Sequence, residues 1–462
     1  MAMGQRKREQ QADLWRVTAD LPGPPGHPFC RRLNGLLAER GFDAYVEGLC
    51  RRFGHEELGR KSIPPGVYFR MLLIGYFEGT DSERGIAWRC DDSRTLREFP
   101  GSAPDQKTPD HSSLSIIRRR IDLETHQEVF AWVLKRVAEK GRLTGKTLGI
   151  DAATLEANAA MRSIVRRDTG ESYNAFRTGR AQASGIATPT REDWARMDRK
   201  RKKKGSNEGG VNPNDPEAKV AKRKDGRTHL AHKAEHAADL DSGAMVAVTL
   251  QGANPGDPTT VGETLRESVN QRGDVKDDPQ TADCLRGPLA AEVVADKGYH
   301  SNDTCRDCRE AGIRTYCSEP KRGRREWKGK KPEQEAVCAN RRRIRGRRGK
   351  ALLRKRGELL ERPFAHCYET GGMRRTHLRG HRNILKRLLI HVCGFNLALI
   401  MRAVFGIGKP RRLQDGLGSV LGGFLDFLAR LLGALRPPLP PLARFRPLRV
   451  VPELEIPLRP AA

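Results

Sequence analysis

The stretch TLGIDAATLEA (residues 147–157) is where the pattern of this sequence changes. It is apolar and β-branched up to Asp151, which predicts a strand that carries an acidic residue. A second apolar run, EVVADKGYHS (292–301), predicts a buried strand that delivers Asp296 at its end. From about residue 28 to 140, apolar residues instead recur at steps of three and four, which predicts helices. The sequence therefore predicts an α/β domain preceded by an all-α domain.

The helical part, residues 28–140, carries arginines along several of its helix faces. Thr108-Pro109 ahead of DHSSLSIIRRRI predicts a helix with Thr108 as its N-cap and proline at its first position. The segment ETHQEVFAWVLKRVAEKG predicts a further amphipathic helix that ends at Gly141. These helices form either a DNA-binding domain or a plain bundle with a solvated basic surface, and the pattern alone favours neither.

The region around the two acidic strands alternates polar segments with regular elements. Residues 162–227 are rich in Gly, Asn, Pro and Lys, which predicts a loop or a disordered insertion. Strand signals resume in THLAHKAEHAADLDSGAMVAVTLQGAN, where Asp241-Ser242-Gly243 predicts a hairpin turn. A helix is expected at about 259–269. A long helical pattern then runs from about 351 to 404, with a break at Gly371-Gly372.

The charge balance favours a polyanionic partner. The chain has 86 Lys and Arg against 57 Asp and Glu, a formal charge of +29, and residues 321–356 alone hold 17 Lys and Arg against 3 Glu. The commonest such partner is a phosphate backbone. A ribosomal protein is less favoured because such proteins are usually much shorter. A membrane protein is less favoured because Asp426 and Arg430 interrupt the most apolar segment, 417–435.

The ten cysteines are scattered, and the N-terminus is polar, with no apolar stretch that a signal peptide needs. We therefore expect a cytoplasmic protein with reduced thiols. The spacing Cys305-x2-Cys308, followed by Cys317 and Cys338, is the one candidate for a zinc site. Since no second CxxC follows, buried or free thiols are the favoured interpretation.

Three acidic residues stand out by their placement: Asp151 and Asp296 at strand ends, and Glu361 on a later helix. Magnesium prefers oxygen ligands and keeps some of its waters, so a few converging carboxylates suffice to hold it. Two such ions activate a water or a 3′-hydroxyl and stabilise the leaving oxygen. Taken singly, each residue has a plainer explanation, since an Asp after a strand is often a turn former and a Glu among arginines is usually ion-paired.

The combination resembles the DDE transposases of bacterial insertion sequences, from about Phe53 to about Gly408. The best-matching pieces are LGIDAATLEANAAM, DGRTHLAHKAEHAADLDSGAMVAVTLQGANPGD, VADKGYHS and RGELLERPFAHCYETGGMRRTHLRGHRNILKRLLIHVCGFNLALIMR. The resemblance implies a ribonuclease H-like mixed sheet with flanking helices behind an all-α N-terminal domain. The implied organisation is a flexible N-terminus (1–27), a helical domain (28–140), a catalytic domain (146–408) with basic insertions at about 162–227 and 318–350, and a variable tail (409–462).

The resemblance assigns the catalytic and metal-binding roles to Asp151, Asp296 and Glu361. Glu358, one helical turn earlier, and Glu369 compete for the third place, and the context ERPFAH favours Glu361. Some relatives carry an arginine and a lysine at fixed steps around the glutamate, but Gly357 and Tyr368 stand there in this chain. Basic contacts to DNA are therefore expected from other residues, namely Arg362, Arg374, Arg375, Arg379 and Lys386, each of which is equally explicable as a solvated helix charge.

The implied activity is metal-dependent cleavage at the terminal inverted repeats of an element and strand transfer into target DNA. The implied cofactor is Mg²⁺ or Mn²⁺, as two ions, and the implied assembly is a homodimer in the synaptic complex, in the bacterial cytoplasm at the nucleoid and not at a membrane. Two alternatives remain at this stage. One is a nuclease of the same fold that does not join DNA, and the other is an inactive, DNA-binding derivative.

Overall fold

A computed structural model describes residues 27–54, 62–102, 106–143, 145–200, 207–222, 228–285, 287–321, 323 and 325–410. All of them belong to one compact unit, Met1–Arg412. The predicted N-terminal extension, up to residue 26, and the predicted tail from residue 411 lie outside the described residues.

The first part of the chain is helical, as predicted. Its helices are α1 (Pro28–Ala38), α2 (Phe42–Cys50), α3 (Pro65–Glu78), α4 (Glu83–Asp92), α5 (Arg94–Arg97), α6 (His111–Arg120) and α7 (Leu123–Glu139). The start of α6 differs from the prediction, because Asp110 is its N-cap and accepts from the amide of Ser112. Thr108 is instead buried, and its hydroxyl donates to Asp91. Helix α7 ends just before Gly141, whose φ of 67° suits glycine.

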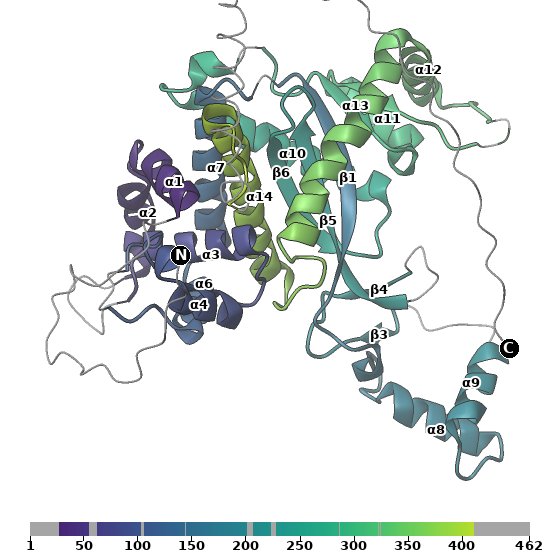
Figure 1. The fold of residues 1–462 in the computed structure, drawn as a ribbon. Helices are drawn as coiled ribbons and strands as arrows, with labels where there is room; N and C mark the ends of the chain where they lie inside the picture. The colour runs from purple at the N-terminus through teal and green to yellow at the C-terminus, as the bar shows by residue number, and fades with distance from the viewer. Residues whose placement is uncertain are drawn as a thin grey trace, which may run out of the picture. The chain divides into compact units, whose positions relative to one another are not determined.

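A helix from the far end of the chain completes this bundle. Helix α14 (His381–Phe405) packs against α7 and α3, and also against strand β6 (Met245–Gly252) (Figure 1). Among the described residues, α14 is the one helix long and apolar enough to cross a membrane, yet 72% of its most apolar window is buried inside the protein. It is therefore the core helix that joins the helical part to the sheet.

The sheet is mixed and centred on β1 (Thr147–Glu156). One neighbour, β5 (Thr228–Asp239), runs antiparallel to it, and the other, β7 (Glu292–Ala295), runs parallel. Strand β8 (Arg314–Cys317) extends the parallel side, while β6 and β4 (Lys219–Lys222) pair with the far edge of β5. The predicted hairpin joins β5 to β6, with Gly243 at a φ of 77°. A ribonuclease H-like mixed sheet behind a helical part is thus confirmed.

Four further helices pack against the strands of this sheet: α10 (Asp257–Asp277), α11 (Asn302–Glu310), α12 (Lys331–Arg345) and α13 (Arg347–Phe364). Helix α10 packs on β6 and β5, whereas α13 crosses β1, β7 and β8 (Figure 1). Gly149 allows α13 to come close, because a Cβ there would lie 3.1 Å from the side chain of Leu360. The long helical pattern does break before α14, where a π-helical turn, Ala365–Thr370, follows α13.

The segment 162–227, predicted as a loop or disordered insertion, contains regular structure among its described residues. It holds helices α8 (Tyr173–Ala183) and α9 (Arg191–Lys200) and the short paired strands β2 (Val165–Arg166) and β3 (Gly210–Val211). Ser172 caps α8, and the guanidinium of Arg177 lies over the rings of Tyr173 and Trp194. These local contacts substitute for the large apolar core that the composition lacks.

Candidate active site

Asp151 and Asp296 lie side by side where the parallel pairing of β1 and β7 ends. Asp296 follows β7 as predicted, whereas Asp151 lies within β1, which continues to Glu156 because its second half pairs with β5, and is not at a strand end. Ile150 and Ala295 are partners in the parallel β1–β7 register, and each aspartate is the next residue along its strand. Neighbouring strands are about 4.8 Å apart, which places the two carboxylates within electrostatic reach of each other. Burial is the main reason that the pKa of Asp151 is raised, and the negative charge of Asp296 raises it further. The structure thus brings together the two aspartates that the sequence singled out.

Arg356 of α13 neutralises Asp151 in this structure. Its Nη2 lies 2.6 Å from Oδ2 of Asp151, and its side chain is largely buried. The other carboxylate oxygen accepts from the amide of Ala152 at 2.9 Å. Arg356 is a residue of this candidate site that the sequence pattern did not single out. The available signal was its position beside Gly357, where the resemblance led us to expect an arginine.

Asp257, the first residue of α10, is a third carboxylate at this edge. A Cβ on Gly298 would lie 2.4 Å from its Oδ2, and its charge contributes to the raised pKa of Asp151. Its Oδ1 is ion-paired with Nζ of Lys233 at 2.6 Å. Asp257 stands at the end of LQGANPGD, where no sequence pattern indicates a role for it. Only the packing of α10 on the sheet places it near residues 151 and 298.

A buried network of hydrogen bonds centred on Glu235 lies next to these carboxylates. Glu235 of β5 is fully buried and accepts from the hydroxyls of Thr260 at 2.8 Å, Thr264 at 2.5 Å and Tyr299 at 3.0 Å. Burial and the nearby carboxylates raise the pKa of Tyr299, so its phenol keeps the proton that it donates. Since Tyr299 ends the short turn that begins at Asp296, this network fixes the direction in which Asp296 leaves the sheet.

Glu361 lies on the helix that covers the site but does not contact the two aspartates. It follows Arg356 by five residues on α13, so the two side chains leave the helix about 140° apart. Glu361 is exposed and forms no ion pair with any described residue. Across the described ranges, no three His, Cys, Asp or Glu side chains are arranged to hold a metal ion.

The two alternatives to Glu361, Glu358 and Glu369, both form ion pairs. Glu358 forms an ion pair with Arg362 at 2.9 Å, and Glu369 forms one with Arg374. Each therefore fits the plain explanation of a surface carboxylate among arginines. Glu361, which has no such partner in the described part of the chain, is the member of the three that is free to bind a cation.

The oxygen-rich edge of the sheet suits a divalent cation. Asp151 and Asp296 offer adjacent carboxylates, and magnesium needs only one or two of these because it keeps several waters. The guanidinium of Arg356 already shows that a positive charge is favourable at Asp151. The donor set of these residues therefore fits the implied ion.

The candidate DNA-binding residues differ in their exposure. Arg362, Arg374, Arg375 and Arg379 are exposed, and the side chain of each makes a polar contact with a neighbour. Lys386 differs from them, because it is buried and its Nζ donates to the carbonyls of Arg118 and Ile121. Its ammonium is thus committed to the junction of α14 with the helical part and is not available to a phosphate. A sequence pattern cannot reveal this, since an apolar helix rarely buries a lysine.

A row of cations on α13 begins in the basic segment predicted at 318–350 and continues beyond it. Arg347, Lys350 and Arg354 are exposed and follow one another at helical steps of three and four residues. None of them is ion-paired with a described carboxylate, and the row continues along the same face to Glu361. Helix α13 therefore presents unneutralised positive charge in line with the third candidate carboxylate.

The cysteines of the candidate zinc site are free thiols. Cys305, Cys308 and Cys317 are buried, and Cys338 is half-buried. Burial raises the pKa of Cys305 to about 11 and that of Cys308 to about 12, so both remain protonated near neutral pH. Cys317 donates its thiol hydrogen to the carbonyl of Asp296 at 2.9 Å. These residues pack against the sheet beside the site.

Comparison with known families gives two matches. Residues 19–120 match the Transposase domain (DUF772), and residues 193–397 match the Transposase DDE domain. The second match includes Lys233, Asp257, Asp296 and Glu361 and begins after Asp151. No curated protein and no solved structure matches the chain. The two family matches, in this order along a helical part and a mixed sheet with paired aspartates, establish that the chain belongs to the DDE transposases of insertion sequences.

Proposed function

We propose that this protein cuts the phosphodiester bonds at the ends of its element and joins the freed 3′-hydroxyls to target DNA. The family makes it an enzyme of the polynucleotidyl-transferase type. The observation that carries the finer proposal is the pair Asp151 and Asp296 on adjacent parallel strands. The guanidinium of Arg356 is already paired with Asp151 there. Two carboxylates at one sheet edge are what a divalent ion needs in order to serve phosphoryl transfer.

Each residue has a distinct part in this proposal. Asp151, Asp296 and Glu361 hold the Mg²⁺ or Mn²⁺ ions, which activate the attacking oxygen and stabilise the leaving one. Glu361 reaches the site when α13 turns about its axis, since its side chain leaves that helix about 140° from Arg356. Arg356 neutralises Asp151 when no ion is held there. The buried network around Glu235 keeps Asp296 in place, which is the preorganisation that such a site requires.

The remaining surfaces supply the DNA contacts in this proposal. The helical part and the basic row on α13 bind the terminal inverted repeats, mainly through phosphates. Arg362, Arg374, Arg375 and Arg379, which follow Glu361 in the chain, add contacts to DNA. We further propose a homodimer, because two ends must be held together, acting at the nucleoid in the cytoplasm. The domain boundaries at residues 140 and 146 are part of the same proposal.

Strand transfer separates this function from its rivals. With pre-cut ends of the element, a supercoiled plasmid and Mg²⁺ or Mn²⁺, we expect joined products, and we expect none when the ion is chelated. A nuclease on the same fold would instead degrade or nick the DNA without joining it. An inactive derivative would bind the ends and leave both substrates intact. Either of these two outcomes contradicts the proposal.

A further inference from the structure

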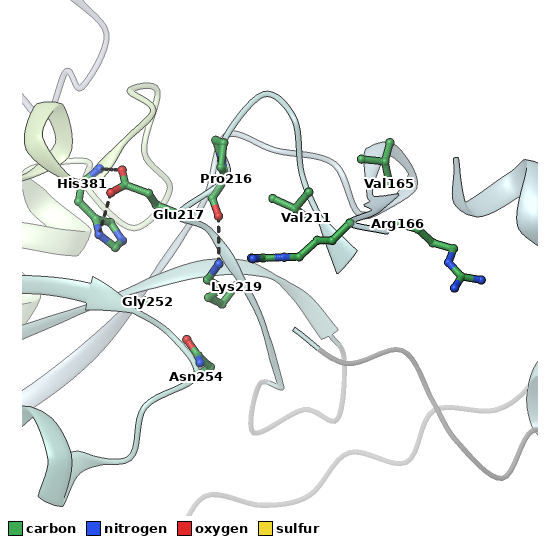
Figure 2. A pocket seen from close by; sticks show the side chains of 10 residues that line it. Val165, Arg166, Val211, Pro216, Glu217, Lys219, Gly252, Asn254 and His381 are labelled. Atoms are coloured by element: carbon green, nitrogen blue, oxygen red, sulfur yellow. Dashed lines mark hydrogen bonds and ion pairs between the residues drawn. The ribbon is translucent and has the colours of Figure 1, made fainter. Parts of the chain in front are cut away.

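A second basic site lies away from the paired aspartates, where the segment 162–227 meets the sheet. It is a pocket of about 800 Å³ formed by strands β2 and β3, the edge strand β4, the end of β6 and the first residue of α14. Its lining residues are Val165, Arg166, Arg167, Val211, Pro216, Glu217, Lys219, Gly252, Asn254 and His381. Figure 2 shows the labelled members of this set.

Two of the lining cations, Arg167 and Lys219, lie close enough to repel each other, and at Lys219 the effect of Arg167 is larger than that of either nearby carboxylate, Glu217 or Asp215. The positive charge of Arg167 is a cause, second to burial, of the lowered pKa of Lys219. Neither side chain is ion-paired with a described carboxylate, and the ammonium of Lys219 donates only to the carbonyl of Pro216, at 3.0 Å. Two like charges held at close range are unfavourable unless an anion binds between them.

The other charged residues of the pocket are already satisfied. Arg166 is ion-paired with Asp168, and its side chain points away from Lys219 in Figure 2. Glu217 is bound to the first residue of α14, where it accepts from the amide of His381 and lies 3.4 Å from the imidazole. The cations of the pocket that form no ion pair with a described residue are therefore Arg167 and Lys219.

Gly252 keeps the space beside Lys219 open. A Cβ at this position would lie 2.8 Å from Oδ1 of Asn254 and 3.1 Å from Cγ of Lys219. Any side chain would thus fill the floor of the pocket. The lining contains no Phe, Tyr or Trp on which a base could stack, and its apolar members are two valines and a proline. These features suit a small tetrahedral anion better than a nucleobase.

We propose that Arg167 and Lys219 bind a backbone phosphate of the DNA on which the transposase acts. This inference rests on the proposed function and adds a DNA contact to it. Lys219 is in register with Ala231, which is in register with Glu156, five residues beyond Asp151 on β1. Strand geometry then places Lys219 about 20 Å from Asp151. At 3.4 Å per nucleotide, the bound phosphate lies roughly six nucleotides from the one that is cut.

The salt dependence of DNA binding tests this site. The probe is a fluorescein-labelled 30-base-pair duplex titrated with the full chain, without divalent ions, at several salt concentrations. Arg167→Gln and Lys219→Gln remove the charges while keeping most of the side-chain volume. Each substitution should reduce the slope of log Kd against log salt by about 0.9, the value for one lost phosphate contact. The matched control is Lys276→Gln, an exposed lysine at the opposite end of α10 from Asp257.

The possible outcomes distinguish a failure of the phosphate-binding pocket from a failure of the proposed transposase function. If both variants keep the slope of Lys276→Gln, the pocket does not bind DNA, whereas the strand-transfer result above is unaffected. If the wild-type chain shows no salt-dependent binding at all, the proposed function fails together with the pocket. In a second arm, inorganic phosphate is titrated at constant ionic strength and followed by ³¹P line broadening. Broadening that Lys219→Gln abolishes, with an unchanged DNA slope, would make this a site for free phosphate and overturn the DNA assignment.

Discussion

Asp151→Asn should abolish cleavage of the element's ends while leaving DNA binding intact. The substitution keeps the shape of the side chain and its contact with the amide of Ala152, but it removes the charge that holds a divalent ion. Loss of a metal-based stabilisation of several kcal/mol corresponds to a fall in rate of about 10³-fold or more. Affinity for DNA should be unchanged or slightly higher, because a negative charge near the phosphates disappears.

The chain offers a matched control for this substitution. Asp241, in the turn between β5 and β6, is also ion-paired with a cation of α13, with Lys355 Nζ at 2.8 Å. Asp241→Asn therefore makes the same change in charge and breaks the same kind of contact, but at a site with no proposed role in catalysis. It should cut DNA at nearly the wild-type rate. If Asp151→Asn does so as well, the assignment of Asp151 is wrong.

The second large effect is expected at Glu361. Glu361→Gln should lower the rate of end cleavage by about 10²-fold to 10³-fold, because it removes the third oxygen ligand of the ions. Glu358→Gln, one helical turn away on the same helix, should leave the rate within about threefold, since it breaks only an exposed ion pair with Arg362. Both variants change one charge on one exposed helix face, so effects on folding and on the local field are matched.

Measuring single-turnover cleavage with both variants distinguishes the two glutamates. Equal rates for Glu361→Gln and the wild type would remove Glu361 from the site. A large loss in Glu358→Gln alone would transfer the role to Glu358. In the first case Asp257 becomes the remaining candidate for the third carboxylate, because it already lies near Asp151 and Gly298.

The two aspartates could be predicted because their signals are local. An unbroken apolar run predicts a buried strand, and the acid that follows the run marks where full burial ends, even though β1 itself continues beyond Asp151 to Glu156. The hairpin at Gly243 and the end of α7 before Gly141 could also be predicted from the sequence, since both depend on backbone conformations that glycine adopts readily. In each case the deciding residues are close together in the chain.

The partners of the aspartates could not be predicted, because packing brings them from distant segments. Arg356 reaches Asp151 only because Gly149 and Leu360 let α13 lie close to β1. Asp257 reaches the same edge only because α10 packs on β5 and β6. A helical pattern shows which residues share a face but not which neighbour that face meets. The same limit applies to Lys386, whose hydrogen-bond acceptors, at residues 118 and 121, are more than 260 positions away.

The most direct test of the central claim is to locate the metal ions on the polypeptide. Fe²⁺ bound in place of Mg²⁺ generates hydroxyl radicals with ascorbate and peroxide, and these cut the chain next to the ion. Mass spectrometry of the fragments should show cuts near residues 151, 296 and 361, and Asp151→Asn should lose them. Cuts near 151, 296 and 257, with none near 361, would contradict the claim that these two aspartates and Glu361 share the ions.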